Sequence, residues 1–140
     1  MLTRALSPSA RLSQRYAEVR ARTVALCDPL AIEDHVPQPV ADVSPPKWHL
    51  GHTTWFFEAL VLGQAMPGQA PHHPRYGFLF NSYYEAEGAR VQRPQRGALS
   101  RPTVDEVLAY RTHVDTAMQR WLAQEPSAQW RRRVELGLQH

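Results

Sequence analysis

The chain has few of the features that mark secreted or membrane proteins. Its 140 residues contain one cysteine, Cys27, so no internal disulfide can form. The longest apolar run, over residues 55–62, is interrupted by Glu58 and is far shorter than the roughly 20 residues that span a bilayer. The first ten residues contain Arg4 but no apolar core of a secretory signal. We therefore expect a cytoplasmic protein with no membrane contact.

Lysine is scarce as well, because Lys47 is the one lysine among the 16 basic residues. The formal net charge is +3, and the arginines are scattered along the chain except for the run 131–133. Scattered arginines are more typical of a solvated surface than of a stripe that follows a phosphate backbone. We expect no nucleic-acid partner.

Several catalytic motifs are also missing. The chain has no glycine-rich phosphate loop, no nucleophile elbow and no HExxH zinc motif, which argues against phosphate, serine-hydrolase and zincin chemistry. No basic residue flanks Cys27 closely, so a structural role is favoured over a reactive thiolate. The residues in unusual supply are 12 prolines and 7 histidines, and the histidines are the candidate functional residues.

Four segments show the three-and-four-residue spacing of helices, and strand patterns are nearly absent. Each begins at a start signal: a Ser-Pro pair at Ser7 and again at Ser44, a capping box formed by Thr103 and Glu106, and Ser127 for the last. We expect helices over residues 8–26, 45–63, 103–124 and 127–140. The second is apolar almost all round, which predicts a central, buried helix. The predicted apolar stripe of the first helix consists of Leu12, Tyr16, Val19, Thr23 and Leu26.

The connection between the second and third helices is unusually long. Residues 63–102 are rich in proline and glycine, and about forty residues far exceed an ordinary bundle connection. The segment is too aromatic for disorder, so we expect a packed, functional crossover with a short helical turn around residues 80–86. The predicted fold is a single all-α domain over residues 1–140, an up-and-down four-helix bundle with one long crossover.

His49 and His52 lie three residues apart on the predicted second helix, so they are neighbours on its surface. A histidine pair on a buried helix can form part of a metal site, but this pattern alone favours two structural histidines with satisfied nitrogens. His52 falls in a seam with Trp48 and Trp55, and Gly51 beside it leaves room for the close approach of another element. His52 is therefore the better candidate ligand.

His140 lies one turn after Leu136 on the predicted fourth helix, pointing toward this seam or its edge. Facing helices of a bundle can place ligands on one metal, so His52 and His140 would make half of a metal site. His72 and His73 lie between prolines in the crossover and are expected to be exposed polar residues. No role is assigned to His35 and His113.

Three stretches resemble a known family. They cover residues 44–58, 79–115 and 135–140, with the sequences SPPKWHLGHTTWFFE, LFNSYYEAEGARVQRPQRGALSRPTVDEVLAYRTHVD and ELGLQH. In this order and spacing they resemble the N-terminal DinB-like domain of ergothioneine-biosynthesis sulfoxide synthases of the EgtB/OvoA type, with selenoneine synthases as close relatives. The resemblance extends over nearly the whole chain from about residue 22.

The resemblance implies a DinB-like bundle joined to a C-terminal domain that is similar to the formylglycine-generating enzyme. Iron lies between the two domains on three histidines. The W-x-L-x-H element assigns the first to His52 rather than His49. His140 matches the first histidine of an H-x-x-x-H-x-E element, whose second histidine would follow four residues later. Arginines of the crossover hold substrate carboxylates in the family, and Arg90 is the best match.

The implied reaction uses Fe(II) and O₂ to join hercynine to a cysteine-type thiol as a sulfoxide. The proton donor lies in the second domain, so no catalytic residue is assigned here. We expect a truncated iron-binding domain with a truncated last helix, weak metal binding and no synthase activity alone. Two alternatives are a DinB-like metal-dependent thiol S-transferase and a non-catalytic interaction module whose exposed patch contains Leu136 and Leu138.

Overall fold

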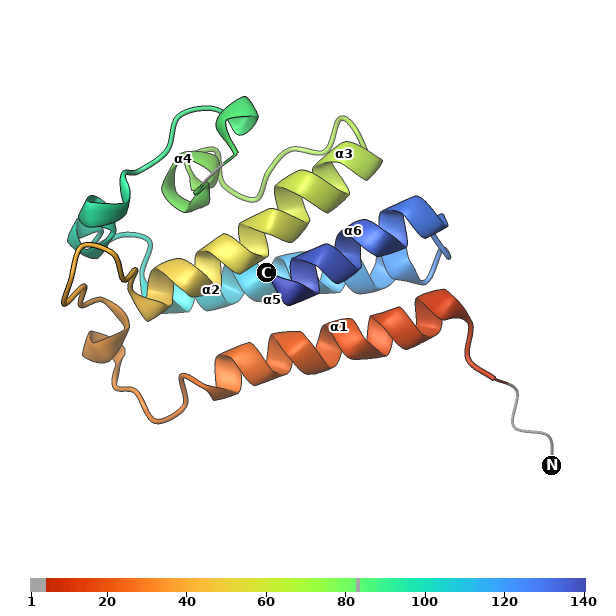
Figure 1. The fold of residues 1–140 in the computed structure, drawn as a ribbon, viewed down its shortest axis with the longest axis horizontal. Coiled ribbons are helices and arrows are strands. Elements are labelled where there is room, and N and C mark those ends of the chain that lie inside the picture. Colours follow the sequence, from red (N-terminus) through yellow and green to blue (C-terminus); the bar gives the residue numbers. More distant parts are fainter. Residues whose placement is uncertain (1–4, 83) are drawn as a thin grey trace.

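The computed structural model describes residues 5–82 and 84–140, and all regular structure within them is helical (Figure 1). The expected all-α bundle is confirmed. Its four long rods are α1 (Pro8–Ala25), a composite rod of α2 (Pro46–Trp55), η2 (Phe56–Leu62) and α3 (Gly63–Ala65), then α5 (Val104–Leu122) and α6 (Ala128–Gln139). Within the described part of the chain, no helix has both the length and the apolar character that a bilayer crossing requires.

The direction of the rods differs from simple up-and-down alternation. Figure 1 shows α2 and α5 running in the same direction, with α1 and α6 running the opposite way. The crossover returns to the end of the bundle where α2 begins, and the Lys47 ammonium there donates to the Leu99 carbonyl at 2.7 Å. A connection that runs back along the bundle places the next helix parallel to the previous one. The order is therefore up-down-down-up.

The helices begin close to the predicted signals, but side-chain caps form at Ser7 and Thr103 and not at the other two: the cap position of α2 is Pro45 rather than Ser44, and Ser127 before α6 makes no cap hydrogen bond. The Ser7 hydroxyl accepts a hydrogen bond from the Ala10 amide at 3.1 Å. At the start of α5 the Thr103 hydroxyl accepts from the Glu106 amide at 3.1 Å, and the Glu106 carboxylate accepts from the Thr103 amide at 2.8 Å. These caps satisfy amides that have no partner within the helix.

The central rod changes its winding in the middle. Residues 56–62 form a π-helical segment, η2, between the α-helical turns on either side. Apolar periodicity does not reveal such a segment, so the sequence predicted one uniform helix here. Short π-helical segments occur frequently at functional sites, because they displace side chains from the regular α-helical positions. Glu58 lies in this segment.

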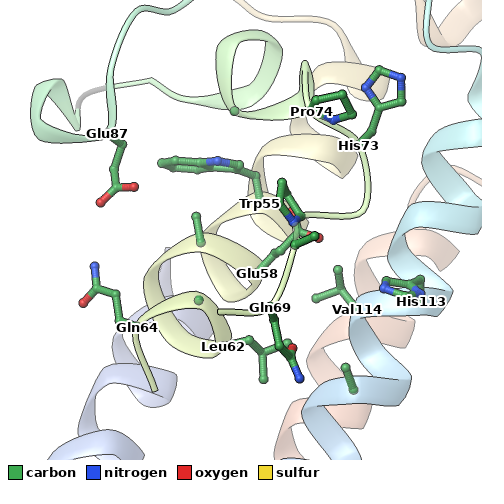
Figure 2. A pocket seen from close by; sticks show the side chains of 16 residues that line it. Trp55, Glu58, Leu62, Gln64, Gln69, His73, Pro74, Glu87, His113 and Val114 are labelled. Carbon is green, nitrogen blue, oxygen red and sulfur yellow. The ribbon is translucent and has the colours of Figure 1, made fainter. Parts of the chain in front are cut away.

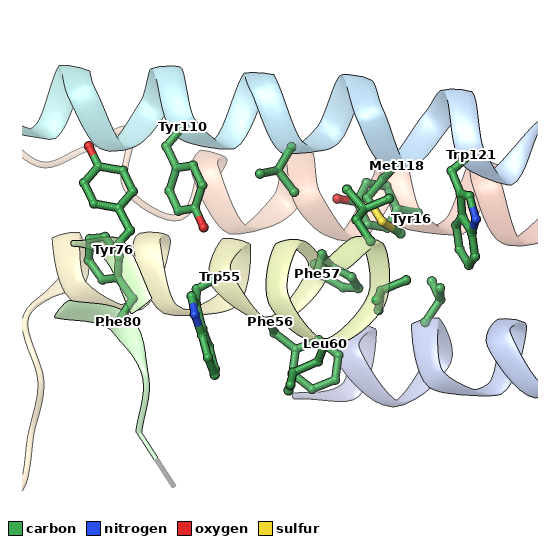
Figure 3. Packing of buried hydrophobic residues seen from close by; sticks show 14 of the residues in the cluster. Tyr16, Trp55, Phe56, Phe57, Leu60, Tyr76, Phe80, Tyr110, Met118 and Trp121 are labelled. Atoms are coloured by element: carbon green, nitrogen blue, oxygen red, sulfur yellow. The ribbon is translucent and has the colours of Figure 1, made fainter. Parts of the chain in front are cut away.

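The core fills the space between the central rod, α1, α5 and α6. Figure 3 shows aromatic side chains of several elements meeting there, and Tyr16, Phe57 and Tyr110 are almost fully buried. The predicted stripe of α1 is wrong at its end, because Leu26 is 72 % exposed. The helix instead buries Arg20, whose guanidinium donates to Asp115 at 2.7 Å and to Thr54 at 2.6 Å. These bonds offset the cost of burying the charge.

The crossover packs against the face of the central rod that the other long helices leave uncovered. It contains α4 (Tyr76–Phe80), η3 (Glu85–Glu87) and η4 (Arg93–Ala98), so the single turn expected at residues 80–86 is replaced by turns on either side of residues 81–84. The Trp48 indole donates to the Leu79 carbonyl at 2.9 Å. Phe80 lies directly over Gly51, where a methyl group would overlap its ring. Phe80 of the crossover thus occupies the space that was predicted beside His52 at Gly51.

We expect Gly51→Ala to destabilise the fold by about 1–3 kcal/mol, because the added methyl must displace the buried Phe80 ring. Urea unfolding measures the change in the free energy of unfolding. Gly77→Ala is the matched control, since its nearest new contact would be an ordinary 3.9 Å to the Trp55 indole nitrogen. Equal stabilities of the two variants would contradict the close packing of Phe80 on α2.

Candidate functional site

Two histidines from opposite ends of the chain meet at one edge of the bundle. The Nε2 atoms of His52, on α2, and His140, at the end of α6, lie 2.8 Å apart. Their ring centroids are 5.0 Å apart and the rings are tilted by 59°. Gly137, one turn before His140, permits this approach, because a Cβ there would overlap Phe56 and Phe57. The two candidates named from the sequence are therefore brought together.

The hydrogen bond at the second nitrogen of His52 fixes the tautomer of the ring. Its Nδ1 lies 2.6 Å from the Phe80 carbonyl oxygen, which can only accept a hydrogen bond. Nδ1 therefore carries the proton, and Nε2 of the neutral ring presents its lone pair toward His140. The Trp48 ring stacks on the imidazole at 4.5 Å and holds its plane.

Burial keeps His52 uncharged. The pKa of His52 is lowered to about 4, chiefly by desolvation and to a smaller extent by the neighbouring His140, Arg96 and His49, while the bond to Phe80 acts in the opposite direction. The side chain is 5 % exposed, so water cannot compensate a positive charge on it. At neutral pH the Nε2 lone pair is available to bind a metal ion or to accept a hydrogen bond.

The separation of the two nitrogens suits a shared metal ion. With the usual metal–nitrogen distance of about 2.0–2.1 Å, a 2.8 Å separation corresponds to roughly a right angle at the metal. Residues 5–82 and 84–140 contain no group of three or more His, Cys, Asp or Glu that is placed to hold a metal. The described residues therefore supply two metal ligands at this site, the imidazoles of His52 and His140. His49 is exposed and lies edge-on to Trp48. It lines the cavity beside the pair.

A cavity of about 360 Å³ opens beside the two histidines, and two arginines line it. The Arg96 guanidinium lies 3.6 Å above the Trp48 ring and donates to the Ser44 and Ser82 hydroxyls at 2.9 and 3.1 Å. Arg93 donates to the Asp42 carbonyl at 3.2 Å. Both belong to η4 and bring positive charge to the cavity.

Arg90, the arginine favoured from the resemblance, does not line this cavity. Arginines recur every third residue at positions 90, 93 and 96, so the sequence alone offers three similar candidates. The start of η4 at Arg93 turns the last two toward His52. The Arg-Pro pair at positions 93 and 94, typical of a helix start, is the signal that could have distinguished them.

Sequence comparison agrees with this architecture at the level of the family. A family model described as the DinB superfamily matches residues 15–138, which include His52 and end two residues before His140. No curated protein matches the sequence.

The low pKa of His52 predicts a pH-dependent stability for the metal-free protein. As the pH falls from about 6.5 to about 4, the unfolded chain binds a proton at this residue and the folded chain does not, so the free energy of unfolding decreases. His52 alone accounts for a loss of about 2 kcal/mol between pH 7 and pH 5. Urea unfolding in EDTA measures the slope.

The comparison variant is His52→Asn, whose carboxamide can still donate to the Phe80 carbonyl but does not titrate. Its stability should vary less between the two pH values than that of the original chain. Identical pH slopes for the two proteins would show that His52 is not held neutral by burial.

Proposed function

Since the chain belongs to the DinB superfamily, we propose that it is the iron-binding bundle of a non-haem sulfoxide synthase. The proposed enzyme joins hercynine to a cysteine-type thiol in an Fe(II)- and O₂-dependent reaction. The observation that carries the proposal is the pair of Nε2 atoms 2.8 Å apart, with the His52 lone pair directed at His140 by the bond to Phe80.

His52 and His140 are the residues that would hold the iron. Imidazole is a suitable ligand for iron, and the neutral state of His52 leaves its nitrogen free to coordinate. When bound, the iron supplies the ability to activate O₂. The reaction balances as thiol, ring C–H and O₂ giving the sulfoxide and one water, with one oxygen atom in each product.

The protein groups around the two histidines have their own tasks. The Phe80 carbonyl and the Trp48 ring orient His52 and keep water from its buried side. Arg93 and Arg96 are suited to bind carboxylates, which both proposed substrates carry. Because Arg96 is buried and fixed by Ser44 and Ser82, it offers a preorganised contact.

Two imidazoles do not complete the ligand set that the proposed chemistry needs. We propose that a third histidine and the facing wall of the active site come from outside these 140 residues, in a domain similar to the formylglycine-generating enzyme. The exposed position of His140 at the edge of the bundle is compatible with such an arrangement.

Metal binding by the chain tests the ligand assignment. In an anaerobic titration with Co²⁺ followed by visible absorption, His52→Ala and His140→Ala should each weaken binding by roughly tenfold or more. The control is His49→Ala, which removes an imidazole that lines the same cavity but is exposed and apart from the pair. An equal loss in the His49 variant, or none in the His52 variant, would rule out the assignment.

Product analysis tests the reaction. With Fe(II), O₂, hercynine and cysteine, the 140-residue chain should form no sulfoxide, and a chain extended by the proposed second domain should form it in air but not under nitrogen. Sulfoxide formation by the 140 residues alone would contradict the incomplete site. Conjugation of the thiol to an electrophile without O₂ consumption would instead identify a metal-dependent thiol S-transferase.

A further inference from the structure

A second cavity lies on another face of the central rod. It measures about 380 Å³ and is enclosed by η2, the start of the crossover and α5 (Figure 2). None of its lining residues lines the cavity beside His52 and His140. The two cavities are separate but adjoin, because Trp55 of this cavity stacks on His52 with ring centroids 6.1 Å apart.

Glu58 is the fixed polar group of this second cavity. The Tyr110 hydroxyl donates to its Oε1 at 2.7 Å, and the His72 amide donates to its Oε2 at 2.9 Å. Tyr110 is fully buried, and burial followed by the charge of Glu58 raises the pKa of its hydroxyl well above the usual range. Tyr110 thus remains a donor, and Glu58 is held in one orientation without being neutralised by a cation.

The remaining wall combines negative charge with aromatic and apolar surface. Figure 2 shows the Trp55 indole between Glu58 and Glu87. Leu62 and Val114 supply apolar surface, and the described residues that line the cavity include no Lys or Arg. Two carboxylates beside an aromatic ring in a concave, largely apolar space favour a cation with a hydrophobic body over an anion or a neutral ligand.

The histidines at this cavity argue against a metal ion as that cation. The Nδ1 of His73 accepts a hydrogen bond from the Arg75 amide at 3.1 Å, which engages that nitrogen. His113 faces the cavity from α5 without two further ligands, since the described residues form no group of three His, Cys, Asp or Glu suited to a metal. The cation that matches these walls is organic.

We propose that this cavity binds a small organic ammonium ion, with the charged nitrogen at Glu58 and the apolar part against Trp55, Leu62 and Val114, while Glu87 adds negative charge on the other side of the indole. The volume of about 380 Å³ lies in the range of natural small-molecule sites. The site is preorganised, because both oxygens of Glu58 are already fixed before a ligand enters.

Three probes of nearly equal shape test the proposal: benzylammonium, benzyl alcohol and benzoate. Binding to ¹⁵N-labelled protein at neutral pH is followed by NMR at the Trp55 indole N–H and the Val114 amide. Benzylammonium should bind with a dissociation constant on the order of 1 mM, a reasonable value for so small a ligand. Benzyl alcohol should bind roughly tenfold more weakly, and benzoate should not bind.

Charge-neutralising variants locate the site. Glu87→Gln, at an exposed position, should weaken benzylammonium binding roughly threefold, and Glu58→Gln should weaken it roughly tenfold. Glu135→Gln on α6 makes the same charge change outside this cavity and should leave binding unchanged. If Glu58→Gln does not fold, the three probes and the Glu87 variant still decide the outcome.

Equal binding of benzyl alcohol and benzylammonium would overturn the proposal, because the site would then be apolar rather than cation-selective. Unchanged binding in both glutamine variants, or the same NMR shifts produced by Zn²⁺ at lower concentration, would also overturn it. For two independent sites, we expect the His52 variant to lose metal binding and to retain benzylammonium binding.

Discussion

The central rod of α2, η2 and α3 is apolar on nearly every side, and such a helix is stable only when protein covers it all round. The helices α1, α5 and α6 cover part of its surface, and the crossover covers the rest (Figure 1). This requirement explains why a forty-residue connection is packed rather than loose. Because both cavities lie where the crossover meets the rod or a neighbouring helix, they follow from the same requirement.

The few polar groups on the buried rod show what such burial demands. Each has a specific partner: His52 donates to Phe80, Thr54 accepts from Arg20, and Glu58 accepts from Tyr110. An unpaired polar group in these positions would cost several times what a hydrogen bond gains. The hydrogen bonds that offset the cost of burying these polar groups also fix the orientation of the His52 ring and the Glu58 carboxylate. One set of contacts therefore stabilises the fold and preorganises both sites.

Local signals account for the parts of the structure that were predictable. Caps at Ser7 and Thr103 and the apolar pattern of the second helix depend on neighbouring residues, and helical spacing was enough to separate His52 from His49. The exposure of Leu26, the π-helical turn and the approach of Arg93 and Arg96 depend on contacts between distant segments. A single sequence holds no local trace of the first two, whereas the Arg-Pro pair at positions 93 and 94 is a local signal for the start of η4. Arg90 was favoured instead from the resemblance. The iron, the substrates and the second domain remain proposals that rest on the resemblance.

The two cavities differ in charge although they adjoin the same rod. The side chains beside His52 include two guanidiniums and one carboxylate, that of Asp42, whereas the described residues around the second cavity include two carboxylates, those of Glu58 and Glu87, and no Lys or Arg. The crossover contributes to this difference, because its earlier part supplies Glu87 and its later part supplies Arg93 and Arg96, whereas Glu58 comes from the rod itself. Positive charge therefore predominates at the cavity beside His52 and negative charge at the second cavity, so each favours one sign of ligand, and neither preference requires a change in the helical scaffold.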